Sequence, residues 1–117
     1  MLEENFISHN DGIWEWHMVN NLTATNATEY KAILLDKLHT LKARAFIFHF
    51  GNECYIDSAG IATLLTLQRK FKSLKTQIVL CTQCEHIREA FFLTKLDVLF
   101  PLESSIEASL SSIRANF

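Results

Sequence analysis

The sequence has few of the residues that mark a specialised structural or chemical class. It contains only three glycines, one proline and three cysteines in 117 residues. No Gly-Lys-Ser or Gly-Lys-Thr occurs, so no phosphate-binding loop is present. No hydrophobic run approaches the roughly 20 residues that a membrane-spanning helix needs, and the N-terminus is acidic where a signal peptide would be basic. These absences argue against nucleotide chemistry by the chain alone and against membrane insertion.

The charge is nearly balanced, with 11 lysines and arginines, 13 aspartates and glutamates, and a formal net charge of −2. The basic residues are scattered along the chain, so they form no electrostatic footprint for nucleic acid. The three cysteines are too few and too unevenly placed for a disulfide framework, which agrees with a reducing compartment. We therefore expect a cytoplasmic protein with free thiols and no direct contact with nucleic acid.

Strand and helix patterns alternate along the chain. Period-two or apolar runs predict strands at 5–8, 13–18, 45–50, 77–81 and 98–102. Helical spacing of apolar residues predicts helices over about 26–42, 58–73, 85–91 and 105–113. This order predicts one α/β domain over residues 1–117. An N-terminal β-hairpin should feed a mixed sheet of four to five strands, with about four helices mainly on one face.

The central helix, expected from about 58 to 73, differs from the other three at its start. The others begin with a capping-box pattern, at 26–29, 82–85 and 104–107. The central helix has no glutamate at the matching position, whether Asp57 or Ser58 is the cap. One interpretation is that Gly60 leaves the backbone open to an anion at the positive end of the helix. The other is that Asp57 simply caps the helix, a contribution of about 1 kcal/mol, and that Gly60 permits close packing.

Enzymatic and metal chemistry are weakly supported by the residue patterns. A nucleophilic serine at Ser58 would need glycine on both sides, and only Gly60 fits. His49, the histidine nearest in sequence, should lie back along the preceding strand. Cys81 and Cys84 have the spacing of a redox pair or half a zinc site, but no two of the five histidines are paired at short spacing to complete it. We therefore expect no catalytic residue, no cofactor and no metal.

The segment 55–61 reads YIDSAGI, follows an apolar strand and precedes a leucine-rich helix. In this setting it resembles the signature of STAS domains, especially the bacterial anti-sigma factor antagonists. The hairpin start, the next strand at 78–81 and the segment 87–100 (IREAFFLTKLDVLF) also look like the corresponding family segments. The resemblance covers nearly the whole chain and implies an STAS-like fold.

What the resemblance implies is a partner switch rather than an enzyme. In such antagonists the serine after the signature aspartate, here Ser58, is phosphorylated by a serine kinase that is also the anti-sigma factor, and a phosphatase reverses the change. The unmodified chain would bind the kinase. Phosphate adds about −1.5 to −2 charges, which a surface built for a neutral hydroxyl does not accommodate, so the modified chain would be released. The partner-binding residues implied are Asp57, Ser58, Ala59, Gly60, Ile61, Thr23 and Asn26.

The sequence departs from the family pattern in two places. The loop after the second strand usually has Gly and then Asp, whereas residues 19–23 read VNNLT, with Thr23 at the usual Asp position. The glycines common after the central helix are absent from 72–76. Some STAS relatives serve lipid-transport complexes, stressosomes or secretion regulation. The alternative function is therefore a subunit that docks on a transport ATPase or another signalling complex without a phosphorylation switch.

Overall fold

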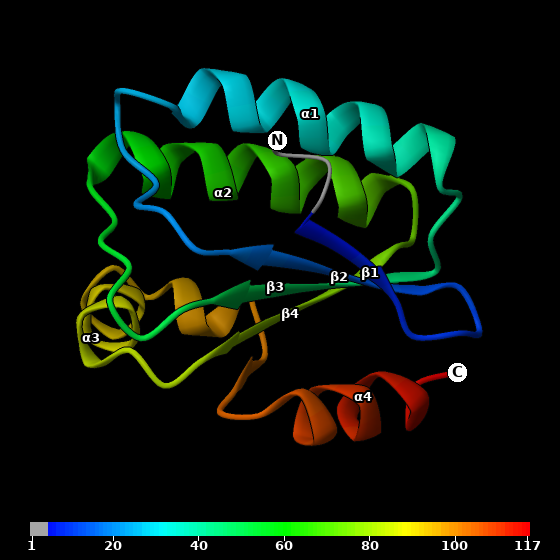
Figure 1. Ribbon diagram of the computed structural model, residues 1–117. Helices are drawn as coiled ribbons and strands as arrows, with labels where there is room; N and C mark the ends of the chain where they lie inside the picture. The colour runs from blue at the N-terminus through cyan, green and yellow to red at the C-terminus, as the bar shows by residue number, and fades with distance from the viewer. Residues whose placement is uncertain (1–4) are drawn as a thin grey trace.

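A five-stranded sheet organises the chain in the computed structural model, which describes residues 5–117 (Figure 1). The strands lie in the sheet in the order in which they occur in the sequence: β1 Phe6–Ser8, β2 Ile13–Met18, β3 Ala45–Phe50, β4 Gln77–Thr82 and β5 Leu102–Glu103. β1 and β2 pair antiparallel, and every later pair is parallel. The predicted α/β class, with a hairpin feeding a mixed sheet, is confirmed.

Four helices cover the sheet unequally: α1 Ala27–Thr40, α2 Ser58–Ser73, α3 Glu85–Leu93 and α4 Ile106–Arg114. Figure 1 shows α1 and α2 on one face of the sheet and α4 on the other. Ile87 and Phe91 of α3 are buried in the same core as the side chains of α1 and α2. Ile113 of α4 belongs to a smaller core on the opposite face. The expectation of helices mainly on one face is therefore confirmed, with α4 as the exception.

The alternating side chains of β2 and β3 explain this inequality. Trp16 and Met18 pair in register with Phe48 and Phe50, and all four are buried beneath α1 and α2. The rings of Trp16 and Phe48 meet edge to face, with centroids 5.6 Å apart. The opposite face of the same two strands carries polar side chains near the strand ends. The apolar face therefore takes most of the helices, because it has most of the surface to bury.

The chain between α3 and α4 differs from the expected strand at 98–102. Residues Leu96–Val98 form a 3₁₀ helix, η2, and β5 starts only at Leu102. Leu96 and Phe100 are both buried in the main core, and the Phe100 N–H donates to the Leu96 carbonyl oxygen. A helical turn brings residues four apart together within one turn, whereas an extended strand would place them on the same side but about 13 Å apart along the chain. Burial of these two residues therefore outweighs the strand-like pattern.

The capping-box patterns lie at the starts of three helices, but only the pattern before α4 supplies a side-chain cap bond. α3 starts after Cys84, which makes no side-chain cap bond, and α4 is capped by Ser105, whose hydroxyl accepts from Ala108 N at 3.0 Å.

α1 ends at Thr40, two residues before the predicted end near Lys42. Lys42 has a left-handed φ of 50°, which ends the helical path.

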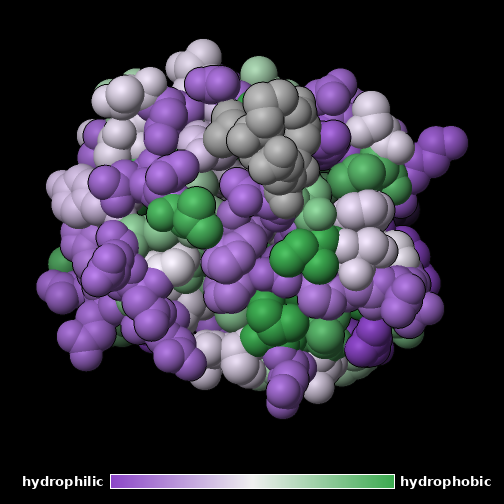
Figure 2. All heavy atoms as spheres, viewed as in Figure 1, coloured by the Kyte–Doolittle hydropathy of each residue, from purple (hydrophilic) through white to green (hydrophobic). Residues whose placement is uncertain are grey.

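The surface in the same view is mainly hydrophilic, and its hydrophobic side chains form separate spots (Figure 2). None of the helices within residues 5–117 is both long enough and apolar enough to cross a membrane.

Candidate functional site

The loop after β3 leads into the first turn of α2, where Asp57 and Ser58 lie. Asp57 has an extended backbone, with φ −111° and ψ −174°, and its side chain accepts a hydrogen bond of 2.9 Å from the Gly60 N–H. Asp57 is therefore the N-cap of α2, and Ser58 is the first helical residue. The choice between the two as the cap is settled in favour of Asp57.

The Asp57 carboxylate also joins the start of α2 to the loop between β2 and α1. Its Oδ2 accepts a 3.0 Å hydrogen bond from the Ala24 N–H, while the Asp57 N–H donates to the Leu22 carbonyl oxygen at 3.3 Å. The Leu22 N–H donates in turn to the Tyr55 carbonyl oxygen at 2.9 Å. Backbone atoms take part in all of these bonds. The two loops, distant in sequence, therefore form one continuous surface.

Gly60 is required by this close approach of the two loops. A Cβ at this position would clash with the Leu22 carbonyl oxygen and would lie 2.7 Å from Ile56 Cγ1. The Gly60 N–H is already engaged by Asp57. Of the two interpretations of Gly60, the structure therefore supports close packing. The interpretation that Gly60 leaves the backbone open to an anion is wrong, because its N–H is used and its Cα faces the neighbouring loop.

The charge state of Asp57 follows from these bonds. Hydrogen bonds from the backbone N–H groups of Gly60 and Ala24 lower the pKa of the Asp57 carboxyl below its ordinary value. The group is therefore a carboxylate at neutral pH, where it compensates the positive end of the α2 dipole. A second anion at this helix start would meet a negative charge that is already present.

Of the seven residues predicted to form the site, Ser58 is the only exposed one. Its hydroxyl forms no hydrogen bond with any of residues 5–117. Gly60 is buried, and the other five are half-buried: Asp57, Ala59, Ile61, Thr23 and Asn26. The structure thus brings all seven to one corner, but an approaching protein would meet the Ser58 hydroxyl most directly.

Asn26 holds the loop together instead of capping α1, which corrects the capping-box prediction. Its Oδ1 accepts from the Thr23 N–H at 3.0 Å, and its Nδ2 donates to the Asn21 carbonyl oxygen at 2.7 Å. The Asn21 side chain in turn accepts from the Tyr55 N–H at 2.7 Å. Asn26 therefore positions Thr23 and the rest of the loop, because both ends of its carboxamide are already used within it.

Tyr55 and His86 form a second side of this corner, which the sequence analysis did not predict. The ring of Tyr55, half exposed, stacks on His86 of α3 with centroids 4.5 Å apart, and His86 Nε2 lies 3.3 Å from the Ile56 carbonyl oxygen. Residues 52–55 and 83–86 line a hollow of about 560 Å³ next to it. Tyr55 is part of the quoted segment 55–61, but nothing in the local sequence predicts its contact with α3.

The cysteines do not form the pair that their spacing allows. Cys81 lies in the small core under α4, whereas Cys84 lies in the main core on the other face. The Cys84 thiol instead donates to the Cys54 carbonyl oxygen at 3.3 Å. All three thiols are free and buried. Cys81 is a buried residue of strand β4.

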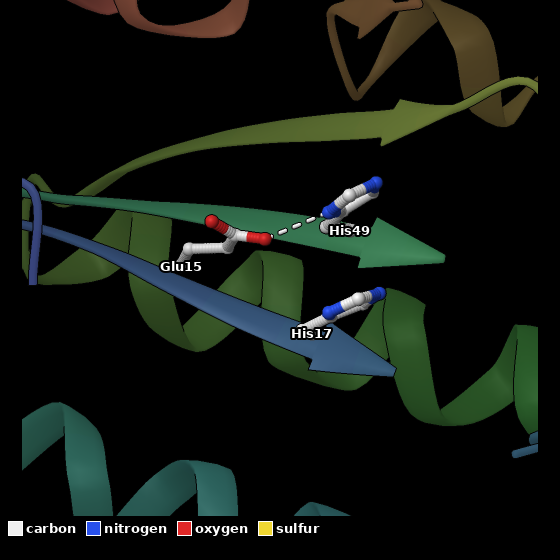
Figure 3. Close-up of side chains that lie close together, drawn as sticks. All are labelled: Glu15, His17 and His49. Carbon is white, nitrogen blue, oxygen red and sulfur yellow. Dashed lines mark hydrogen bonds and ion pairs between the residues drawn. The ribbon is translucent and has the colours of Figure 1, made fainter. Parts of the chain in front are cut away.

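The structure also brings together three potential metal ligands that sequence spacing did not reveal. Glu15 and His17 on β2 and His49 on β3 lie beside one another on the α4 face of the sheet (Figure 3). The parallel register of β2 and β3 places His17 opposite His49. One clue was present in the sequence: Glu15 and His17 are two residues apart and therefore point to the same face of their strand. Their alignment with His49 depends on the register of β2 and β3, which local sequence does not specify.

The chain matches the STAS domain family over residues 7–109. A relative in Bordetella bronchiseptica, BtrV, is named as a candidate anti-sigma factor antagonist. It is 27% identical over 97 residues, which is 83% of this chain and 80% of BtrV.

Solved structures share the fold at low sequence identity. A Thermotoga maritima protein described as a candidate anti-sigma factor antagonist has a TM-score of 0.82 and 16% identity over 93% of this chain and 92% of its own. A sulfate transporter family protein of Wolinella succinogenes has a TM-score of 0.76 and 15% identity over 93% and 90%. Phosphorylated SpoIIAA of Bacillus has a TM-score of 0.67 and 13% identity over 92% and 96%.

Proposed function

Because the chain belongs to the STAS domain family, we propose that it is a partner-switching regulator of the anti-sigma factor antagonist type. In its unphosphorylated form it binds an anti-sigma factor that is also a serine kinase, through the start of α2 and the loop around Thr23. Phosphorylation of Ser58 releases the kinase, and a cognate phosphatase restores binding. The whole chain, 1–117, acts as one binding module and not as an enzyme.

The observation that carries this proposal is the position of Ser58. It is the exposed first residue of α2, directly after the capping Asp57, and its hydroxyl is not used by any other residue within 5–117. The backbone around it is held by the Asp57 bonds to Gly60 and Ala24. A kinase would therefore find an accessible hydroxyl on a rigid corner, and the fold does not depend on that hydroxyl.

Release by phosphorylation follows from the electrostatics of the corner. A phosphate on Ser58 adds about −1.5 to −2 charges next to the Asp57 carboxylate, which is already ionised. The first turn of a helix has N–H groups without a partner inside the helix. The Gly60 N–H is one of these groups, but it already donates to Asp57 and is not available to the phosphate. The added charge therefore remains at the surface, where burying it against a partner is costly.

The comparisons support the same type of function. BtrV is named as a candidate anti-sigma factor antagonist, and SpoIIAA has been solved in a phosphorylated form. His49, the nearest histidine in sequence, is hydrogen-bonded to Glu15 on the α4 face of the sheet and is not placed to activate Ser58. This placement favours a serine that accepts a phosphate over a catalytic nucleophile.

A second candidate function is a docking subunit of a transport complex, without a phosphorylation switch. It is favoured by the similarity of the fold to the Wolinella succinogenes sulfate transporter family protein. Under this alternative Ser58 would be only the first residue of α2, and its hydroxyl would have no role in binding.

Phosphorylation by a serine kinase of the anti-sigma factor type from the same organism tests the two proposals. The chain is incubated with that kinase and Mg-ATP and then analysed by mass spectrometry. We expect one phosphate on Ser58, none in Ser58→Ala, and normal phosphorylation of Ser73→Ala, which removes an exposed serine at the other end of α2. Ser58→Glu should bind the kinase about 10-fold or more weakly. An unmodified Ser58, or Ser58→Glu binding as tightly as the wild type, would contradict the switch and favour docking.

A further inference from the structure

The α4 face of the sheet carries a group of side chains that the proposed partner switch does not use. Glu15, His17 and His49 each offer a ligand atom, and these atoms all lie within 4.8 Å of one another (Figure 3). His17 and His49 are direct partners in the parallel register, and their rings stack with centroids 4.5 Å apart and planes 9° apart. Two rigid neighbouring strands thus hold all three side chains together.

Glu15 is the most buried member of this group, and both of its oxygens are hydrogen-bonded. Its side chain is only 6% exposed, and its two oxygens are held separately: Oε1 by His9 Nε2 and Oε2 by His49 Nδ1, both at 2.7 Å. Both oxygens are thus engaged by histidine nitrogens, and the carboxylate is fixed in orientation. A buried anion of this kind requires a cation or strong donors beside it.

His17 is the member whose position the hydrogen bonds leave unexplained. Neither of its ring nitrogens bonds to a protein atom within residues 5–117, although it stands beside a buried carboxylate and a second histidine. His17 and His49 are both half-buried, so an ion could reach the group from solvent. α4 packs mainly against β3, β4 and β5, and so covers chiefly the other half of this face.

We propose that Glu15, His17 and His49 bind a divalent transition-metal ion of the zinc class. Two imidazoles and one carboxylate form a typical donor set for Zn²⁺, at metal–ligand distances of about 2.0–2.2 Å. In a tetrahedral site of that size the ligand atoms are about 3.4 Å apart. Binding therefore requires side-chain rotation: the widest pair must close from within 4.8 Å, and the His49 Nδ1–Glu15 Oε2 pair must open from 2.7 Å. The two stacked rings must also turn out of parallel, because an imidazole binds a metal in its own plane. The ion takes the place of the proton in the hydrogen bond between His49 Nδ1 and Glu15 Oε2, and that proton is released to solvent.

His9 is the positioning residue of this site. Its bond to Glu15 Oε1 leaves Oε2 facing the two other histidines. Outer partners of this kind fix the orientation of a ligand and typically change metal affinity 10–100-fold. Three protein ligands leave a fourth position for water.

Binding of Zn²⁺ to the full chain, without an affinity tag, tests the proposal. A chromophoric chelator competes for the ion at neutral pH, and Co²⁺ replaces Zn²⁺ for visible spectroscopy. We expect about one ion per chain and an affinity about 10-fold or more weaker in His17→Ala. The matched control is His39→Ala, which removes an exposed histidine of α1 and should bind as the wild type does.

His17→Ala is the decisive variant, because its ring takes no part in the His9–Glu15–His49 bonds and its loss should leave the fold intact. Urea midpoints of the two variants confirm that both remain folded. His9→Ala should bind the ion more weakly but with an unchanged Co²⁺ spectrum. Failure of the wild type to bind one equivalent of Zn²⁺, or equal affinities of His17→Ala and His39→Ala, would overturn the proposal.

Discussion

Replacing Gly60 by alanine tests the central geometric feature of the candidate site, the close approach of α2 to the β2–α1 loop. The new Cβ would clash with the Leu22 carbonyl oxygen and lie 2.7 Å from Ile56 Cγ1. The Leu22 backbone cannot move away freely. Its carbonyl oxygen accepts from the Asp57 N–H, and its N–H donates to Tyr55. The start of α2 must therefore shift away from the loop, which would stretch the hydrogen bond from Ala24 to Asp57.

The size of the effect follows from two opposing terms. Forcing one extra carbon into a packed site costs about 1–3 kcal/mol, and the upper half of that range applies because the main obstacle is backbone. Alanine is favoured over glycine in a helix by at most about 1 kcal/mol. The expected net loss in the free energy of unfolding is therefore about 1–2 kcal/mol, and the urea midpoint should fall by about 0.5–1 M.

Equilibrium urea unfolding followed by far-UV circular dichroism measures this loss. Gly51→Ala is the matched control, since a Cβ there would lie 3.6 Å from the Met18 carbonyl oxygen and 3.7 Å from Cys54 Sγ, which are ordinary contacts. That variant should stay within about 0.5 kcal/mol of the wild type or be slightly more stable. If Gly60→Ala were as stable as the wild type, or if both variants lost the same stability, the close packing would not be what requires glycine.

Two further predictions concern Asp57 and the adjacent phenylalanines of α3. Because the folded pKa of Asp57 is lowered, its advantage over Asp57→Asn should be present above the pKa of the unfolded chain and lost as pH falls through the folded pKa. Urea midpoints across this acid range measure it, and a difference independent of pH would contradict the assigned bonds. Phe91 is fully buried and Phe92 is 71% exposed, so Phe91→Ala should cost about 3–5 kcal/mol and Phe92→Ala less than about 0.5 kcal/mol. Equal midpoints for these two variants would refute the burial pattern.

Local patterns were sufficient for most of the secondary structure. The strand Ala45–Phe50 and the helix Ser58–Ser73 were predicted with the bounds that the structure has. Their period-two and helical spacings arise from a single buried face, which each element carries in its own sequence. The order of the elements then restricted the topology to parallel crossovers after an antiparallel hairpin. The α/β class and the family resemblance therefore followed without knowledge of tertiary contacts.

Choices between competing local partners were not predictable in the same way. The Asn26 side chain can cap α1 or close its own loop, and the loop contacts with Thr23 and Asn21 decide for the latter. The segment 98–102 has a strand-like composition, but burial of Leu96 and Phe100 imposes a helical turn before β5. In the first case the deciding contacts lie three and five residues away in the same loop, and in the second case burial in the main core decides.

The candidate site also has features that the local sequence determines and features that depend on tertiary contacts. The sequence by itself determined that Asp57 and Ser58 stand at the start of a helix after a strand, because cap, hydroxyl and helix are neighbours in the chain. Only the tertiary structure decided that Ala24 shares the Asp57 carboxylate and that His17 lies opposite His49. Both contacts depend on how separate segments align. A strand register that slips by one residue would move each side chain to the other face, and local sequence does not specify that alignment.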